Sequence, residues 1–147
     1  MKRKTVIEIL SSLLILLFVY ASVSKWLDFH TYIGEINNQP FPNWMTPALV
    51  WLIPLTEVSI AMLLMFEKTQ LLGFWASLVL MSLFTIYTIL ILLKFFGRVP
   101  CSCGGVIEKL SWKQHLFLNL FFVGVAITGI VLRKKEALNA SYPITDS

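Results

Sequence analysis

Residues 71–96 read LLGFWASLVLMSLFTIYTILILLKFF, a run in which Lys94 is the only charged side chain. A helix that crosses a bilayer needs roughly 20 consecutive apolar residues, and this segment is long enough to do so. Its extra length predicts a tilted helix or one that extends beyond the membrane. Three more segments are similarly apolar, so the predicted spans are residues 6–27, 47–66, 71–96 and 112–132.

The composition of the whole chain also indicates a membrane protein. Of its 147 residues, 57% are hydrophobic and only 14% are charged, with a mean hydropathy of +0.77. A soluble domain of this size has too much surface for its volume to bury so many apolar side chains. We therefore expect an all-α integral membrane protein, a four-transmembrane-helix bundle over residues 1–135. Residues 136–147 are expected to form a short, polar, disordered tail.

Basic residues predict the topology, because they cluster at residues 2–4 and 133–135, on either side of the spanning region. Such clusters stay in the cytoplasm, and an even number of spans places both termini on one side, so both termini are expected to be cytoplasmic. The loops at residues 28–45 and 97–111 then lie outside. The net charge of +4 does not indicate nucleic-acid binding, because the basic residues lie at helix ends rather than along one surface.

The N-terminal span also has features of a cleavable signal peptide, namely a basic start and small residues around Ala21. The apolar run continues to Leu27, however, and Glu8 lies early within it. We therefore expect a retained helix. Cleavage would leave three spans and would not change the side on which the third loop lies.

The only two cysteines, Cys101 and Cys103, lie in the sequence PCSCGG at residues 100–105. Outside the cytoplasm, disulfides form and persist. A disulfide across one intervening residue closes a very small ring, which stabilises a fold little and is easily reduced. We favour a redox-active pair over a metal site, inert thiols or a structural bridge. Because no second pair exists, a relay through two internal pairs is excluded.

The cations and histidines near this loop are compatible with more than one kind of site. Arg98, Lys109 and Lys113 either favour a thiolate or anchor the helices at the interface. With the two cysteines, His30 and His115 would make a ligand set suited to zinc or copper. The cysteine spacing is unusual for structural zinc, so we assign no metal ligands and keep metal handling as an alternative.

His115 and Asn119 are four residues apart and share one helix face. That face points at the cysteines, at a quinone headgroup, or at a neighbouring helix with which it hydrogen-bonds. No cofactor is certain, and a quinone is the candidate. Aromatic residues near the third and fourth spans could stack on a quinone ring, although ordinary packing explains each of them. They are Phe95, Phe96, Phe117, Phe121 and Phe122.

Glu57 is the strongest candidate for a functional residue inside the membrane. It lies about eleven residues into the second span and therefore near mid-bilayer. A carboxylate there is costly and faces the bundle interior with a partner. Pro54, one turn earlier, frees a backbone carbonyl. We expect Lys25 to be the partner of Glu57, with Asp28 as a second neighbour of Lys25 at i+3. The pair is either a proton or quinone site or an ion pair that locks the bundle.

Together these segments resemble the MauE branch of the DoxX-like membrane proteins. The resemblance rests on Ser-Lys-Trp-Leu-Asp at residues 24–28, Pro-Leu-Thr-Glu at 54–57, and Cys-Ser-Cys-Gly-Gly at 101–105 before a fourth span that opens with Ser-Trp. It implies a four-helix membrane bundle, with Cys101 and Cys103 as the redox motif and Lys25 and Glu57 as the charged pair. The chain differs in carrying Gly104-Gly105 where many relatives carry Phe-Gly.

MauE proteins are implicated in maturing the disulfide-rich small subunit of methylamine dehydrogenase, and DoxX proteins in quinone-linked sulfur oxidation. The resemblance therefore implies a bacterial inner-membrane protein that assists disulfide formation or maturation of an extracytoplasmic partner with thiols or disulfides. Whether it is an enzyme, a thiol-disulfide oxidoreductase, or an accessory factor is left open. The alternatives are a non-enzymatic membrane subunit or assembly scaffold, and a metal-handling protein.

Overall fold

In the computed structural model, residues 2–39, 42–94 and 112–141 are described, and they are almost entirely helical. The described elements are α1 (Arg3–Leu27), α2 (Phe29–Asn38), η1 (Asn43–Met45), α3 (Thr46–Met65), α4 (Gln70–Leu92) and α5 (Trp112–Ser141). Four helical segments in this part of the chain are long and apolar enough to span a membrane: α1, η1 with α3, α4, and α5. The expected all-α fold with four spans is confirmed.

Two span boundaries differ from those expected. Helix α5 continues beyond the expected end at residue 132 as far as Ser141, so residues 136–141 are helical rather than a disordered tail. This stretch is rich in good helix formers and extends an existing helix, which avoids the cost of nucleation. Helix α4 ends at Leu92 and not at residue 96, since Lys94 adopts a left-handed backbone with φ of 56°.

The loop between the first two spans contains a helix, α2, that the sequence did not predict. Asp28 caps α2 by accepting a hydrogen bond from the Thr31 N–H at 3.4 Å, and therefore does not pair with Lys25. The helix ends at Asn38, shortly before Pro40, as expected from the restriction that proline places on the residue before it. Tyr32 is buried, and its hydroxyl donates to the Leu49 carbonyl of α3. The loop thus folds back on the bundle.

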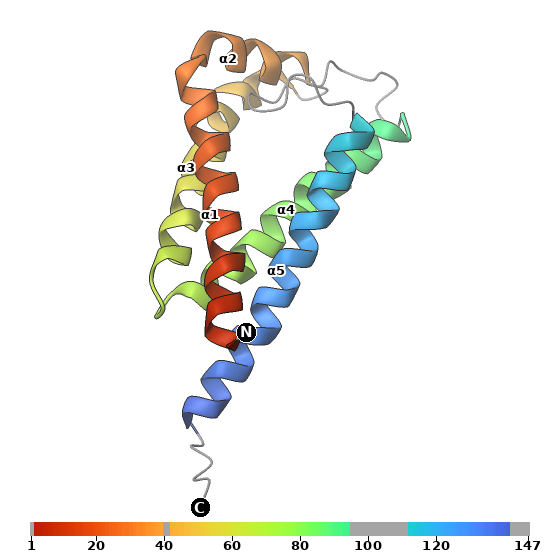
Figure 1. Cartoon of the computed structure of the whole chain (residues 1–147). Coiled ribbons are helices and arrows are strands. Elements are labelled where there is room, and N and C mark those ends of the chain that lie inside the picture. Colours follow the sequence, from red (N-terminus) through yellow and green to blue (C-terminus); the bar gives the residue numbers. More distant parts are fainter. Residues whose placement is uncertain (1, 40–41, 95–111, 142–147) are drawn as a thin grey trace, which may run out of the picture.

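The spanning helices pack as two pairs, α1 with α3 and α4 with α5 (Figure 1). The pairs meet near the α3–α4 turn, at the end of the bundle where α1 begins and α5 ends. They diverge towards the end that carries α2, where α1 and α4 lie apart (Figure 1). We name these the closed end (residues 3–15, 60–77 and 122–141) and the open end (residues 17–38, 46–57, 81–92 and 112–119).

Small residues allow close packing at the closed end. A Cβ atom added to Gly129 of α5 would lie 2.3 Å from Cε1 of Phe74, whose side chain is fully buried in α4. Glycine at this position therefore lets the two helices approach, as is common in membrane bundles. A Cβ added to Gly73 of α4 would likewise lie 2.9 Å from the Leu64 side chain of α3, so the contact between the two helix pairs is also close at this end.

Candidate functional site

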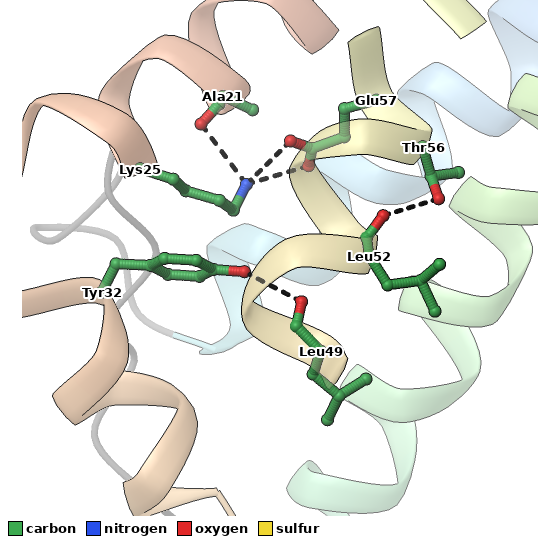
Figure 2. A network of polar contacts seen from close by, with 7 residues as sticks. All are labelled: Ala21, Lys25, Tyr32, Leu49, Leu52, Thr56 and Glu57. Carbon is green, nitrogen blue, oxygen red and sulfur yellow. Dashed lines mark hydrogen bonds and ion pairs between the residues drawn. The ribbon is translucent and has the colours of Figure 1, made fainter. Parts of the chain in front are cut away.

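An ion pair joins α1 to α3 at the open end. The Lys25 ammonium donates to Glu57 Oε1 at 2.9 Å and to Oε2 at 3.2 Å, with a longer bond to the Ala21 carbonyl at 3.4 Å (Figure 2). The Glu57 side chain is 2% exposed and that of Lys25 is 16% exposed. All three ammonium hydrogens therefore have acceptors, which is what a desolvated lysine requires. The expected pairing of these two residues is present.

Helix α3 lacks one backbone hydrogen bond in the turn before Glu57. Pro54 lies inside the helix and has no N–H, so the carbonyl one turn earlier, that of Val50, lacks its helical donor. The Tyr32 hydroxyl reaches the adjacent carbonyl of Leu49 from α2 (Figure 2). Burial, followed by the nearby carboxylates of Glu57 and Glu35, raises the pKa of Tyr32, and its hydroxyl stays a donor at neutral pH.

A cavity of about 200 Å³ lies next to the ion pair and is lined by all four spanning helices. Most of its lining is apolar, and Phe18, Phe84 and Trp112 contribute aromatic rings. Its polar groups come from the helices on either side: Lys25, Glu57, Tyr87, Thr88, His115 and Asn119. A mostly apolar cavity with a few convergent polar groups is the usual form of a small-molecule site.

The face opposite the ion pair is built by α4 and α5. Asn119 donates through Nδ2 to Thr88 Oγ1 at 3.3 Å, and Thr88 in turn donates to the Phe84 carbonyl at 2.8 Å. This chain of bonds fixes the orientation of the Asn119 amide. The His115 ring lies against Trp112, with centroids 6.0 Å apart at 48°. The polar groups of this wall are thus held in place before any ligand binds.

Tyr87 ties the mouth of the cavity to α2. Its ring meets Trp112 edge to face with centroids 6.3 Å apart, and its hydroxyl hydrogen-bonds to Gln39 at the end of α2. The cavity is therefore bordered by the spans and by the loop helix. A ligand bound there would contact residues from both diverging helix pairs.

The structure brings four of the expected site residues together. Lys25, Glu57, His115 and Asn119 all line the cavity, although they come from three helices. Cys101 and Cys103 lie outside the described residues, as do Arg98 and Lys109. His30 is exposed on α2 and does not line the cavity. Among the residues that the structure describes, no three His, Cys, Asp or Glu side chains are grouped as metal ligands would be.

The aromatic residues singled out from the sequence are not those of the cavity. Phe117 and Phe121 are exposed on the outside of α5, Phe122 belongs to the core, and Phe95 and Phe96 lie outside the described residues. The aromatic residues that line it, Phe18, Phe84, Tyr87 and Trp112, were missed. A usable signal was present, because Phe84, Thr88 and their neighbours recur at helical spacing on one face of α4.

The family model described as methylamine utilisation protein MauE matches residues 3–132, a region that contains all the spans except the end of α5. The chain therefore belongs to the MauE family and is a multi-pass membrane protein of that family. No curated protein and no solved structure matches the chain.

Proposed function

We propose that this MauE-family membrane protein is a thiol-disulfide redox protein of the bacterial inner membrane. It assists disulfide formation or maturation of an extracytoplasmic partner through Cys101 and Cys103. The observation that carries the proposal is the cavity at the open end, where the charged pair and the His115–Asn119 face meet. Trp112, which lines this cavity, is the first residue of α5 after the cysteine loop.

The thiol chemistry follows ordinary exchange. A thiolate of the partner attacks one sulfur of the Cys101–Cys103 disulfide, and the other sulfur leaves as a thiolate. The second partner thiol then breaks the mixed disulfide, so that the partner becomes oxidised and the pair becomes a dithiol. Reoxidation of the dithiol releases two electrons and two protons. A quinone, when bound, supplies an acceptor for both.

The residues of the cavity fit a quinone ring. Its volume of about 200 Å³ suits a single substituted ring, given that a cavity of roughly 150 Å³ holds benzene. The second N–H of the Asn119 amide can donate to one ring oxygen, and the Lys25–Glu57 pair and His115 lie in the wall around the ring. Phe84 and Phe18 supply apolar contact and exclude water. Glu57 and His115 are also groups that can hold a proton at the cavity wall.

The topology that the proposal needs is supported by the charges of the chain. The basic groups Lys4 and Arg133–Lys135 lie at the closed end, which we therefore place in the cytoplasm. The open end and the cysteine loop then face outward, where disulfides persist. Residues 1–135 act as a single membrane domain.

The test follows the thiols of the purified protein. The chain is reduced in nanodiscs without quinone, decylubiquinone is added, and samples are quenched with acid and alkylated with a mass-tagging maleimide. We expect the pair to reoxidise within minutes. Asn119→Leu should slow reoxidation by about tenfold, the value of one hydrogen bond of roughly 1.4 kcal/mol. Phe117→Leu, exposed on the same helix, is the matched control and should not change the rate.

Other outcomes select the alternatives. Thiols that stay reduced in the presence of quinone and an oxidised partner would contradict the proposal and favour a non-enzymatic membrane scaffold. Thiols that become reactive only after a chelator is added would favour metal handling. In cells, a single Cys101→Ser or Cys103→Ser variant should trap a mixed disulfide with the partner, and failure of both variants to do so would count against the thiol mechanism.

A further inference from the structure

A second, larger cleft of about 660 Å³ lies at the closed end, on the opposite side of the bundle from the redox site. It is bordered by the first turns of α1, the α3–α4 turn and the last turns of α5. Its mouth is charged, while Ile7, Ile15 and Leu64 line it further along. Lys4 and Ile15 are about 16 Å apart along α1, close to the thickness of one hydrocarbon leaflet.

An amide that makes no hydrogen bond within the described protein lines this cleft. Gln70, the first residue of α4, is 7% exposed and lines the cleft. Its side chain forms no hydrogen bond with any described residue. Since no buried side-chain nitrogen or oxygen of the described residues lacks a hydrogen-bond partner, the Gln70 amide is accessible from the cleft and can bond to a ligand there. The amide can donate to a phosphate or ester oxygen.

The cations of the cleft are partly engaged. Lys4 pairs with Glu67 at 3.0 Å, and Arg133 donates through Nη2 to the Glu67 carbonyl at 2.9 Å. A guanidinium has five N–H donors, so Arg133 keeps several for a phosphate group. Arg133 and Gln70 thus offer donors from two helices to the same space.

Two carboxylates of the cleft, Glu8 and Glu136, act on Lys4 through space but are not within salt-bridge distance of a described cation. Within the described ranges, neither Glu8 nor Glu136 forms an ion pair, and neither carboxylate accepts a hydrogen bond. The cleft holds two cations and three carboxylates, a net charge of −1. The lining by itself therefore offers an anionic headgroup no net attraction. A headgroup with a primary ammonium would instead place its N–H groups on the free carboxylates.

We propose that this cleft binds the headgroup of a zwitterionic amine phospholipid, of the phosphatidylethanolamine class. The phosphate accepts hydrogen bonds from Arg133 and Gln70, and the ammonium donates to Glu8 and Glu136. One acyl chain lies along the partly exposed Ile15 towards the bilayer core. This inference does not depend on the redox function, because it rests on the other end of the bundle.

The test is native mass spectrometry of the full chain in detergent with three lipids of identical acyl chains. We expect phosphatidylethanolamine to bind about tenfold more tightly than phosphatidylcholine, whose quaternary ammonium cannot donate hydrogen bonds. It should also bind more tightly than phosphatidylglycerol. Equal binding of the amine and choline lipids, or tightest binding of phosphatidylglycerol, would overturn the proposal.

Variants identify the site. Glu8→Gln with Glu136→Gln should abolish the preference for the amine lipid, whereas Asp28→Asn, which removes a carboxylate at the open end, should keep it. Gln70→Leu should weaken the binding of all three lipids without changing the order of their affinities. If the double variant does not fold, Glu136→Gln alone makes the same test. Competition by soluble phosphoethanolamine as effective as the lipid itself would overturn the assignment to a lipid.

Discussion

The two ends of the bundle carry the same kind of ion pair in opposite surroundings. Lys25–Glu57 at the open end and Lys4–Glu67 at the closed end each join α1 to α3 or its following turn, at 2.9 Å and 3.0 Å. The first pair is 16% and 2% exposed, the second 66% and 65%. Two ion pairs of nearly equal length therefore differ in how much stability is lost when one partner is removed. A buried charge that loses its partner is stranded, whereas an exposed one is taken up by water.

The two ends also differ in how tightly their helices pack. At the closed end, Gly129 lets α5 lie against Phe74, and the core there is continuous. At the open end the helices diverge around a cavity that polar groups line. The closed end therefore provides rigidity, and the open end uses that rigidity to hold polar groups in a cavity.

The largest expected effect comes from breaking the buried pair. Glu57→Leu leaves the Lys25 ammonium without its main acceptors and should destabilise the bundle by about 3 kcal/mol. Glu57→Gln keeps an acceptor and should cost clearly less. The double variant Lys25→Leu with Glu57→Leu should recover most of the loss, because no charge is left stranded. Thermal unfolding in detergent, followed by circular dichroism, measures all three. An unchanged melting temperature in Glu57→Leu would refute the role of the pair.

The next effect tests close packing at the closed end. Gly129→Ala places a Cβ on the Phe74 ring and should cost about 1–3 kcal/mol, because the ring is fully buried and cannot move aside freely. Gly124→Ala, on the same helix with no atom within 4 Å of the added Cβ, is the matched control and should be neutral or slightly stabilising. Equal melting temperatures for the two variants would show that the closed end is not tightly packed.

A smaller effect is expected for the loop helix. Tyr32→Phe removes the hydroxyl that bonds to Leu49 and should cost about 1 kcal/mol. The raised pKa of Tyr32 adds a pH test, because its folded state favours the protonated form. That contribution is complete below the ordinary tyrosine pKa of about 10 and is lost as the pH rises above it. The melting temperature of the wild type should therefore fall more above pH 10 than that of Tyr32→Phe.

The smallest effect is expected for the exposed pair. Lys4→Gln and Glu67→Gln should leave the melting temperature of the detergent-solubilised protein nearly unchanged, in contrast to Glu57→Leu. The hydrogen bond from Lys4 lowers the pKa of Glu67, so its small contribution is present above the ordinary glutamate pKa of about 4.3 and is lost as the pH falls below it. A drop as large as that of Glu57→Leu would remove the contrast between the two ends.

Sequence reasoning reached the four spans and the Lys25–Glu57 pair, and it missed α2 and most of the cavity lining. Lys25 was identifiable because a carboxylate in mid-membrane needs a cation and Lys25 lies near it in depth. Phe18 was not identifiable, because it looks like an ordinary core residue of its own helix, whereas Phe84 carried only the signal of its helical spacing with Thr88. Whether such a side chain faces a cavity or a neighbour depends on where two other helices lie.

The sequence by itself determined that the chain is a helical membrane protein, because span length and backbone hydrogen bonding are properties of each segment alone. It also determined that Glu57 needs a buried partner. Only the tertiary structure decided that the helix pairs meet near the α3–α4 turn, where Gly73 lies against Leu64, and diverge at the other end. It also decided that His115 and Asn119 line one cavity with the ion pair. These features depend on how closely helices distant in the sequence approach each other, which no single segment specifies.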